Sequence, residues 1–430
     1  MKTSTRRDFL KTSLGVSGLL FGGFRCHAGQ SFEIGRPYSG WQTGELDIHV
    51  IYTGRGESLF HIFPDGTSML IDAGDHELRG HGPMPNLPDT SRRAGEWVAR
   101  YIQRVNPAES HVDYVMLSHF HPDHGGKEGP GVEMTTGRGE DYALSGLAQA
   151  GEFLQFDYGF DRGYPDYAFP TPDLNPTGEN FRKFTSWAMK EKGLKMEKFE
   201  PGVLDQIRLQ KDPSYDFHIR NLSANGVVWT GKGTDTHNFL PDYKEKNAKE
   251  NPLSLSLTIQ YGRFRYYTGG DLDTAIPDET GKPVPIEAAA GLAAGRVDVC
   301  KANHHVSNNA CTDEFVQAVQ ARAYLSTVWV DGQPGMEASA RLLSRENYPG
   351  KRRFFPQLIS EKRLAAIAEA PWRGEVATDG GHVVLKVFDS GRQYKIYYLT
   401  AEDESMTVKA LYGPYPSTGA IRDAAYRENV

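Results

Sequence analysis

The sequence has few cysteines, no internal repeat, no low-complexity run and no P-loop. Its glycine-rich stretches GRGES and TGKGTDT lack the Lys-Ser/Thr context of a P-loop, and most such stretches are turns. Cys300 and Cys311 are the cysteines in the body of the chain, and they are consistent with one disulfide or with two buried thiols. With 39% hydrophobic and 24% charged residues, the composition is that of a globular protein.

The first 28 residues differ in character from the rest. The stretch TRRDFLK is followed by a modestly apolar segment rich in Gly and Ser, which is too short to cross a bilayer core of about 30 Å as a helix. Residues 1–28 resemble a twin-arginine export signal. The resemblance implies cleavage after Ala28, no membrane span after removal of the signal, and a periplasmic or secreted protein.

The chain has fewer basic than acidic residues, 48 against 55. Its formal net charge is −7, and loss of the five basic residues and one acidic residue in 1–28 would leave −11. A field of that sign repels nucleic-acid backbones unless basic residues gather at a groove, for which Lys127, Arg162 and Lys301 are candidates. We therefore expect a small-molecule or oligonucleotide substrate and no stable nucleic-acid partner.

Apolar patterning predicts strands first, and then strands that alternate with helices. Short apolar runs at 112–118 and 297–303 predict buried strands that end directly before histidines, and helical spacing marks 92–105. This order, in two similar halves, predicts an α+β fold with two sheets and helices outside them. We interpret the aromatic-rich and proline-rich residues from about 130 to 250, with a helix at 180–193, as an insertion that shapes a substrate cleft or decorates the surface.

The stretch HFHPDHGG places three histidines and an aspartate within six positions. His119 and His121 are two residues apart, so both rings face the same way in an extended chain. Pro122 then begins a turn or helix that directs Asp123 and His124 into the same space. Imidazole together with carboxylate suits zinc, manganese or iron, and two interleaved ligand pairs favour a binuclear site.

These motifs carry a family resemblance. HFHPDH matches the H-x-H-x-D-H signature of the metallo-β-lactamase superfamily. LDIHVIYTGRGES, NPLSLSLTIQYGRFRYYTGGD, VDVCKANHHVSNN and VATDGGHVVLKV resemble, in order, motifs of its competence-type (ComEC-like) branch. The resemblance implies an αβ/βα four-layer sandwich, with two sheets packed face to face and helices outside. It also implies a single domain over residues 29–430, interrupted by the insertion at about 130–250.

The resemblance further implies a ligand set in which two groups of side chains share one aspartate. The expected metal ligands are His119, His121, Asp123, His124, Asp271 and His305. His119 and His121 would hold one ion, and Asp123 and His124 a second, with Asp271 bridging the two. His304 would line the pocket, although either histidine of that pair could be the ligand.

Asp72 would orient a ligand histidine from outside the metal shell. Because the chain has one more glycine than the family before Asp271, Asp273 is the alternative bridging residue. The segment KENPLSLSL lacks the histidine that many members place before the bridging aspartate, and His218 and His237, further upstream, are weak substitutes. We expect one or two Zn²⁺ ions, with Mn²⁺ or Fe as alternatives, and water could complete the first site.

The expected reaction follows from metal chemistry. A metal ion acidifies its bound water to hydroxide near neutral pH, Asp123 or Asp271 can orient that water or take its proton, and His304 can stabilise the developing oxyanion. We therefore predict an exported metal-dependent hydrolase that attacks a phosphodiester or related ester bond. A lactonase or β-lactamase-like C–O or C–N hydrolase is the alternative. The non-enzyme alternative is a metal-binding surface or interaction protein with a vestigial site.

Overall fold

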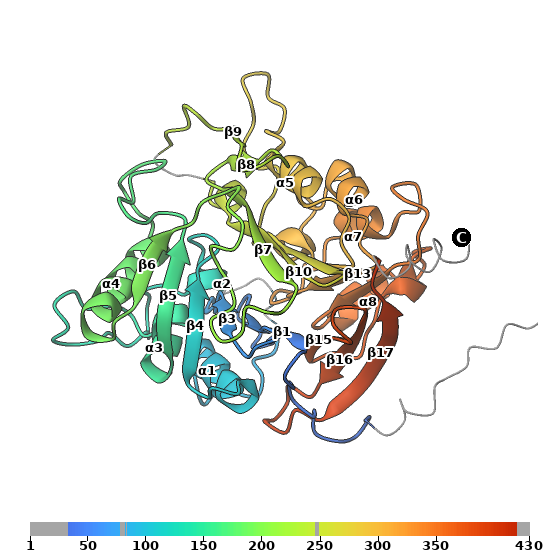
Figure 1. Cartoon of the computed structure of the whole chain (residues 1–430), viewed down its shortest axis with the longest axis horizontal. Helices are drawn as coiled ribbons and strands as arrows, with labels where there is room; N and C mark the ends of the chain where they lie inside the picture. Colours follow the sequence, from blue (N-terminus) through green and yellow to red (C-terminus); the bar gives the residue numbers. More distant parts are fainter. Residues whose placement is uncertain (1–32, 78–81, 83, 246–248, 419–430) are drawn as a thin grey trace, which may run out of the picture.

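The computed structural model describes residues 33–77, 82, 84–245 and 249–418 (Figure 1). The expected export signal, residues 1–28, lies outside the described residues. Among the helices of the described part, none has the length and apolar character needed to cross a membrane.

Two β-sheets form the centre of the described structure. The first has the strand order β17-β16-β15-β1-β2-β3-β4-β5-β6, and the second has the order β14-β13-β12-β11-β10-β7-β8-β9. The strands of the first sheet are β1 (Leu46–Val50), β2 (Leu59–Ile62), β3 (Ser68–Ile71), β4 (His111–Met116), β5 (Gln155–Asp161), β6 (Lys195–Lys198), β15 (His382–Phe388), β16 (Gln393–Leu399) and β17 (Val408–Pro416). The strands of the second sheet are β7 (Phe217–Ala224), β8 (Val227–Trp229), β9 (Thr236–Asn238), β10 (Ser256–Tyr261), β11 (Phe264–Thr268), β12 (Val299–Lys301), β13 (Ala323–Ser326) and β14 (Arg353–Pro356).

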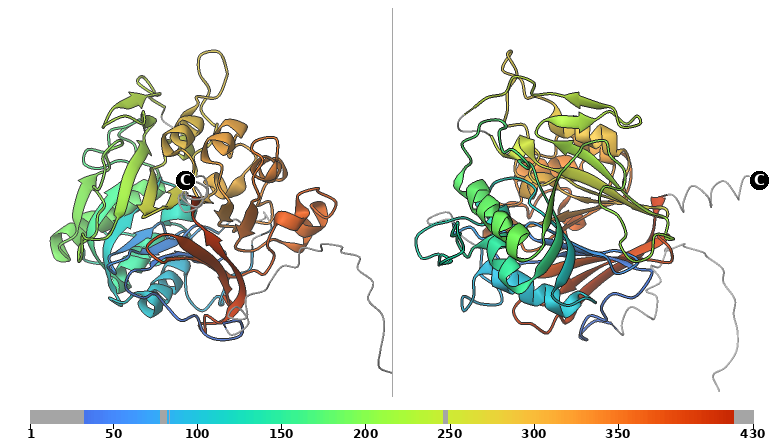
Figure 2. Two further views of the ribbon diagram at one scale, coloured as in Figure 1. Left: turned by 45° about the vertical axis from the view of Figure 1, so that its right-hand side comes forward. Right: turned by 60° about the vertical axis from the view of Figure 1, so that its left-hand side comes forward.

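Helices cover the outer face of each sheet (Figure 1, Figure 2). The α-helices are α1 (Ala94–Val105), α2 (Pro122–Gly125), α3 (Gly146–Phe153), α4 (Pro176–Glu191), α5 (Ile286–Ala294), α6 (Asp313–Val319), α7 (Met336–Leu343) and α8 (Glu361–Ala366). Short 3₁₀ helices are η2 (Asn251–Leu253), η3 (Asn303–Val306) and η4 (Arg373–Glu375). One hydrophobic cluster lies between the sheets, a second joins α1, α3 and α4 to the first sheet, and a third joins α6 and α7 to the second sheet.

This arrangement confirms the predicted α+β, four-layer αβ/βα sandwich. Alternation in β1 places Leu46, Ile48 and Val50 in the cluster between the sheets. Helical spacing in α1 places Val98 and Ile102 against the outer face of the first sheet, which confirms the helix predicted at 92–105. The apolar faces of both element types are thereby removed from water, which stabilises the fold.

The segment from about 130 to 250 is organised differently from the expected insertion. It supplies β5 and β6 to the first sheet and β7, β8 and β9 to the second, so it forms part of both sheets. The reason lies in its apolar residues, because Phe160 of β5 and Ile219 of β7 are fully buried in the cluster between the sheets. The helix predicted at 180–193 is α4, whose Phe181 and Phe184 pack on the outer face of the first sheet.

The parallel part of each sheet determines where polar side chains gather. β3, β4, β5 and β6 run parallel in the first sheet, and β11, β12, β13 and β14 run parallel in the second. Parallel strands end at a common edge, which is where α/β structures place their chemistry. The residues that follow β3, β4, β11, β12 and β13 are the ones that form the candidate site.

Candidate metal centre

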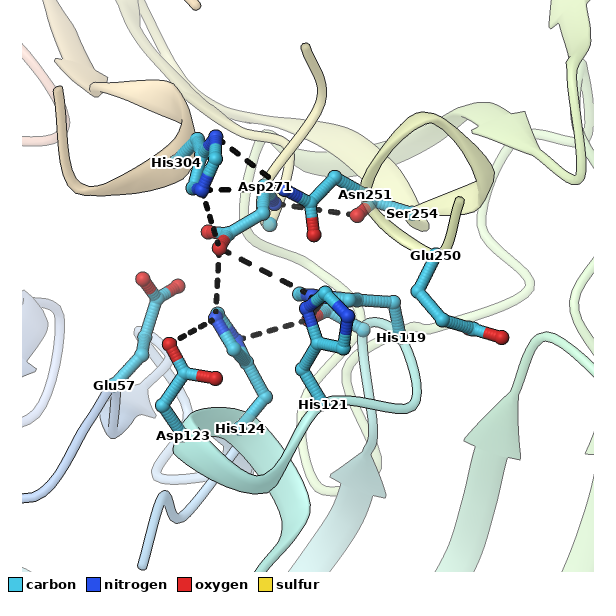
Figure 3. Close-up of polar contacts among 12 residues, drawn as sticks. Glu57, His119, His121, Asp123, His124, Glu250, Asn251, Ser254, Asp271 and His304 are labelled. Atoms are coloured by element: carbon cyan, nitrogen blue, oxygen red, sulfur yellow. Dashed lines mark hydrogen bonds and ion pairs between the residues drawn. The ribbon is translucent and has the colours of Figure 1, made fainter. Parts of the chain in front are cut away.

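Three donor atoms form a nearly equilateral triangle at the ends of these strands. Nε2 of His124 lies 3.2 Å from Oδ2 of Asp271 (Figure 3), and Nε2 of His305 lies 3.3 Å from each of these two atoms. Oδ2 of Asp123 adjoins the triangle, 3.1 Å from His305 and 3.9 Å from His124. Ligands held tetrahedrally at 2.0–2.1 Å from zinc lie about 3.3 Å apart, so these separations suit a divalent cation.

A second donor pair lies beside the triangle. Nε2 of His119 is 3.1 Å from Nδ1 of His121 and 4.0 Å from Oδ2 of Asp271. The same aspartate oxygen therefore lies between the two donor groups, as Figure 3 shows. The structure brings all six predicted ligands together, and it places His305 rather than His304 among the donors.

No third histidine joins the first pair among the described contacts. His218 is exposed and pairs with Asp205, while His237 is exposed and packs its ring against Phe239. The segment before Asp271 contributes Ser254 instead, whose hydroxyl accepts a hydrogen bond from the backbone N–H of Asp271 at 3.2 Å. The first donor pair therefore has two imidazoles and no third among the described residues.

The backbone around the site adopts left-handed conformations at several residues other than glycine. φ is 46° at His304, 49° at His305 and 62° at Asp72. Such residues cost about 1–2 kcal/mol each, and they concentrate at functional sites. The turn at the end of β12 directs His305 into the buried donor group and leaves His304 partly exposed, with 22% of its side chain accessible.

Asp273, the alternative bridging residue, has another role. Its Oδ2 lies 3.2 Å from Nδ1 of His304 and accepts hydrogen bonds from the amides of Asn251 at 2.9 Å and Asn309 at 2.7 Å. Nε2 of His304 then lies 3.9 Å from Oδ2 of Asp271. Asp273 therefore orients His304 at the rim of the site, while Asp271 faces the donor groups.

Hydrogen bonds fix which nitrogen of each buried histidine is free. Asp72 accepts from Nδ1 of His124 at 2.7 Å and from the Ser118 hydroxyl at 2.7 Å. Since the Ser118 hydroxyl donates to Asp72, it accepts from Nδ1 of His119 at 3.1 Å. Nδ1 of both histidines is therefore engaged, and Nε2 is the nitrogen that faces Asp271 and would bind a metal ion once any proton on it is displaced. Asp72 thus contacts one of the expected ligand histidines directly.

A similar series of hydrogen bonds orients His305, and it contains residues that were not predicted from the sequence. The hydroxyl of Thr327 donates to Oε2 of Glu57 at 2.9 Å, so it accepts from Nδ1 of His305 at 2.7 Å. The same Glu57 oxygen pairs with Nζ of Lys301 at 2.5 Å, and both charged side chains are fully buried. A lysine in a buried strand, three positions before His304, was the signal that could have indicated a buried partner.

Two of the three cations considered for a substrate groove are not at a surface. Lys301 is buried against Glu57, and Arg162 is buried in a bidentate pair with Glu250. Their burial follows from position, since one lies on the central strand β12 and the other directly follows β5. Lys127 alone of the three is partly exposed.

The metal-free donor groups are strongly coupled by charge. Burial lowers the pKa of His124, but the carboxylates of Asp271 and Asp72 outweigh it and hold this pKa well above its usual value. Burial likewise lowers the pKa of His305, yet Asp271 and Asp123 raise it to about 9. Burial raises the pKa of Asp271, and the neighbouring histidines hold it well below its usual value. A bound divalent cation would take over the charge that these protons supply.

The donor set therefore fits a divalent cation. Glu57, His124, Asp271 and His305 each offer a ligand atom, all within 4.8 Å of one another, and all four residues are buried. Oε1 of Glu57 and Oδ1 of Asp271 are buried and have no hydrogen-bond partner. Unpaired buried carboxylate oxygens are costly, and a cation would relieve that cost. Cys300 and Cys311 are both free and buried, so neither thiol is in a disulfide.

No family model and no curated protein matches this chain. Among solved structures, a mutant of CmlA beta-hydroxylase is similar over 73% of this chain, at 12% identity and a TM-score of 0.38. The aligned region covers 53% of the CmlA chain, so this chain spans about half of its length. Unliganded yeast PDE1 is similar over 80% of this chain and 99% of its own, at 10% identity and a TM-score of 0.34. The sandwich architecture itself is assigned from the strand order of this chain.

Proposed function

We propose that this chain is an exported metal-dependent hydrolase that cleaves a phosphodiester or a related ester bond. The observation that carries the proposal is the position of Asp271, whose Oδ2 lies 3.2 Å from His124, 3.3 Å from His305 and 4.0 Å from His119. One carboxylate oxygen is thereby shared by two groups of donors. This geometry supports two adjacent cation positions of the kind that clamp the oxygens of a displacement reaction.

The residues of the site have different proposed roles in cation binding and substrate binding. A divalent cation, when bound, supplies a Lewis acid and lowers the pKa of water in its coordination shell. Asp123, Asp271, His124 and His305 would hold a cation at the buried position, while His119 and His121 would hold one at the other. Figure 3 shows His304 on the opposite side of Asp271 from His124, where its partly exposed ring can hydrogen-bond to a substrate oxygen.

The resemblance of HFHPDH and the later motifs to the ComEC-like branch supports the phosphodiester over other esters. The twin-arginine-like stretch TRRDFLK supports export. The burial of Arg162 and Lys301 favours a short substrate over a long nucleic acid, because neither cation is available to contact a polyanionic backbone.

The proposal is tested by metal analysis combined with a substrate panel. Purified protein loaded with Zn²⁺ or Mn²⁺ is assayed with bis-p-nitrophenyl phosphate, a single-stranded oligonucleotide, a lactone and a cephalosporin. We expect cleavage of the phosphodiesters and its loss in His119→Ala, while the exposed His237→Ala, a matched control, behaves as wild type. Cleavage of the lactone or cephalosporin alone would reassign the substrate class. Metal-loaded protein that cleaves nothing would overturn the hydrolase proposal.

A further inference from the structure

Glu57 is a buried carboxylate of the site that lies outside the H-x-H-x-D-H signature. It follows the turn at Gly54 to Gly56, and its side chain is fully buried. The backbone around it is fixed, because the Glu57 N–H donates to the Asp123 carbonyl at 2.7 Å and the Glu57 carbonyl accepts from Gly74 N–H at 2.8 Å. A Cβ on Gly56 would lie 2.1 Å from the Asp123 carbonyl oxygen, so this approach requires glycine. Glu57 is therefore locked beside the metal-binding loop.

The two oxygens of Glu57 have different surroundings. Oε2 accepts from Thr327 at 2.9 Å and pairs with Lys301 at 2.5 Å. Oε1 has no hydrogen-bond partner although it is buried. Glu57 also lies in the compact group with His124, Asp271 and His305, and Figure 3 shows its carboxylate facing the space that Asp271 and His124 face. The unpaired oxygen is thus available to the same cation as the donor triangle.

Lys301 keeps this carboxylate in place. Its ammonium group is fully buried, pairs with Glu57, donates to the Gly270 carbonyl at 2.8 Å and lies 4.0 Å from Oδ1 of Asp271. A lysine buried without its pair would be strongly destabilising, so Lys301 and Glu57 are fixed by each other. The lysine also offsets part of the negative charge that three carboxylates bring to one position.

We propose that Glu57 is a further ligand of the buried cation position and shifts its selectivity toward Mn²⁺ or Fe²⁺ relative to Zn²⁺, with Lys301 as its positioning residue. This inference rests on the proposed metal-dependent function and deepens it. With Glu57, the position has three carboxylates and two imidazoles. Carboxylate-rich sites suit manganese, imidazole with carboxylate suits iron, and zinc in proteins favours about four ligands rich in nitrogen or sulfur.

The quantity to measure is the ratio of Mn²⁺ affinity to Zn²⁺ affinity, because most sites bind Zn²⁺ more tightly than Mn²⁺. Metal-free protein is titrated calorimetrically with Mn²⁺ and with Zn²⁺, using wild type, Glu57→Gln and Asp298→Asn. Asp298 is a buried carboxylate at the opposite end of the β12 region, where it bonds to Arg265 and Thr418, so its variant controls for loss of a buried charge. We expect Glu57→Gln to weaken the binding of Mn²⁺ at least about tenfold more than that of Zn²⁺, because manganese prefers carboxylate oxygens more strongly than zinc does.

A spectroscopic measurement covers the case in which Glu57→Gln does not fold. Glu57→Asp keeps the charge that Lys301 needs but withdraws the carboxylate by one methylene. Co²⁺ bound to wild type should show the weak visible absorption of a five- or six-coordinate ion, and Glu57→Asp should shift toward the intense four-coordinate spectrum. Equal weakening of Mn²⁺ and Zn²⁺, or a Co²⁺ spectrum unchanged by Glu57→Asp, would overturn the ligand role. Wild type that binds no ion at all would overturn the proposed function itself.

Discussion

Nδ1 of His305 lies 2.7 Å from the hydroxyl oxygen of Thr327, and that hydroxyl donates to Glu57 at 2.9 Å. The threonine therefore sets the tautomer of a histidine that is itself 3.3 Å from His124 and from Asp271. Thr327→Val preserves the shape of the side chain but removes the acceptor. We expect metal affinity to fall about 10–100-fold with the fold retained, measured by calorimetric titration alongside circular dichroism. Unchanged affinity would show that the hydroxyl does not orient His305.

Asp72 is expected to act in the same way on the other side of the site. Asp72→Asn removes the carboxylate that accepts from Nδ1 of His124 and from Ser118. Its amide can donate toward His124 and favour the wrong tautomer, so we expect a loss of metal affinity of about 10–100-fold. The matched control is Asp161→Asn, because Asp161 is also a buried carboxylate that accepts from a hydroxyl, that of Tyr167, and it is not among the grouped metal-donor residues. Equal losses in both variants would indicate a general effect of removing a buried charge.

The Arg162–Glu250 pair is expected to stabilise the loop that carries His119 and His121. Both side chains are buried, the Arg162 guanidinium lies 4.3 Å from the Phe120 ring centre, and Glu250 accepts from the Phe120 N–H at 3.3 Å. Arg162→Met leaves the Glu250 carboxylate buried without its partner. Breaking such a pair costs about 3–5 kcal/mol, which denaturant unfolding can measure.

The control for this prediction is Arg345→Met. Arg345 and Glu375 form an ion pair in which the side chains are 69% and 36% exposed. Exposed pairs of this kind contribute about 0–1 kcal/mol. If the two arginine variants lose similar stability, the buried pair does not hold the loop.

Buried neutral histidines are expected to make the protein sensitive to acid. Burial lowers the pKa of His61 to about 3, and both of its ring nitrogens lack a hydrogen-bond partner among the described residues. Since an unfolded histidine has a pKa of about 6.5, the unfolded state binds the extra proton first. The stability contributed by neutral His61 is thus present above about pH 6.5 and is lost as the pH falls toward 3, at about 1.4 kcal/mol per pH unit.

His61→Met is expected to flatten that dependence. Unfolding free energies of wild type and variant are compared at several pH values between 7 and 4, with chelator present so that the metal ligands contribute equally to both. As the pH falls, the free energy of unfolding should decrease more steeply in wild type than in the variant. The difference should be about 1.4 kcal/mol per pH unit, which corresponds to one proton bound on unfolding. Parallel curves would show that His61 is protonated or accessible in the folded protein.

Much of the site could be predicted from sequence, because its residues follow buried parallel strands that end at one edge. The cluster from His119 to His124 is local, and Asp271 and His305 each come directly after an apolar run. Local spacing could not decide between His304 and His305. That choice depends on a left-handed turn, with φ of 46° and 49°, that sequence patterns do not encode.

A lysine in a buried strand hints at a buried partner, but the sequence does not identify Glu57 as that partner, since Glu57 lies between β1 and β2 of the first sheet and Lys301 in the second sheet. The stretch GRGES reads as a turn, and Lys301 reads as a surface cation. The strands within residues 130–250 could not be predicted from the sequence for a related reason. Their aromatic and proline content masks the strands β5 and β7, whose Phe160 and Ile219 become core only when both sheets are present.

The central claim is that one buried position, surrounded by His124, Asp271 and His305, binds a divalent cation. Anomalous diffraction from crystals grown with Mn²⁺ and collected at a wavelength where manganese scatters anomalously tests it most directly. We predict a peak within coordination distance of Asp271, His124 and His305, with Glu57 as a further ligand. A map with no anomalous peak near Asp271 at saturating Mn²⁺, or with peaks only at surface carboxylates, would contradict the account.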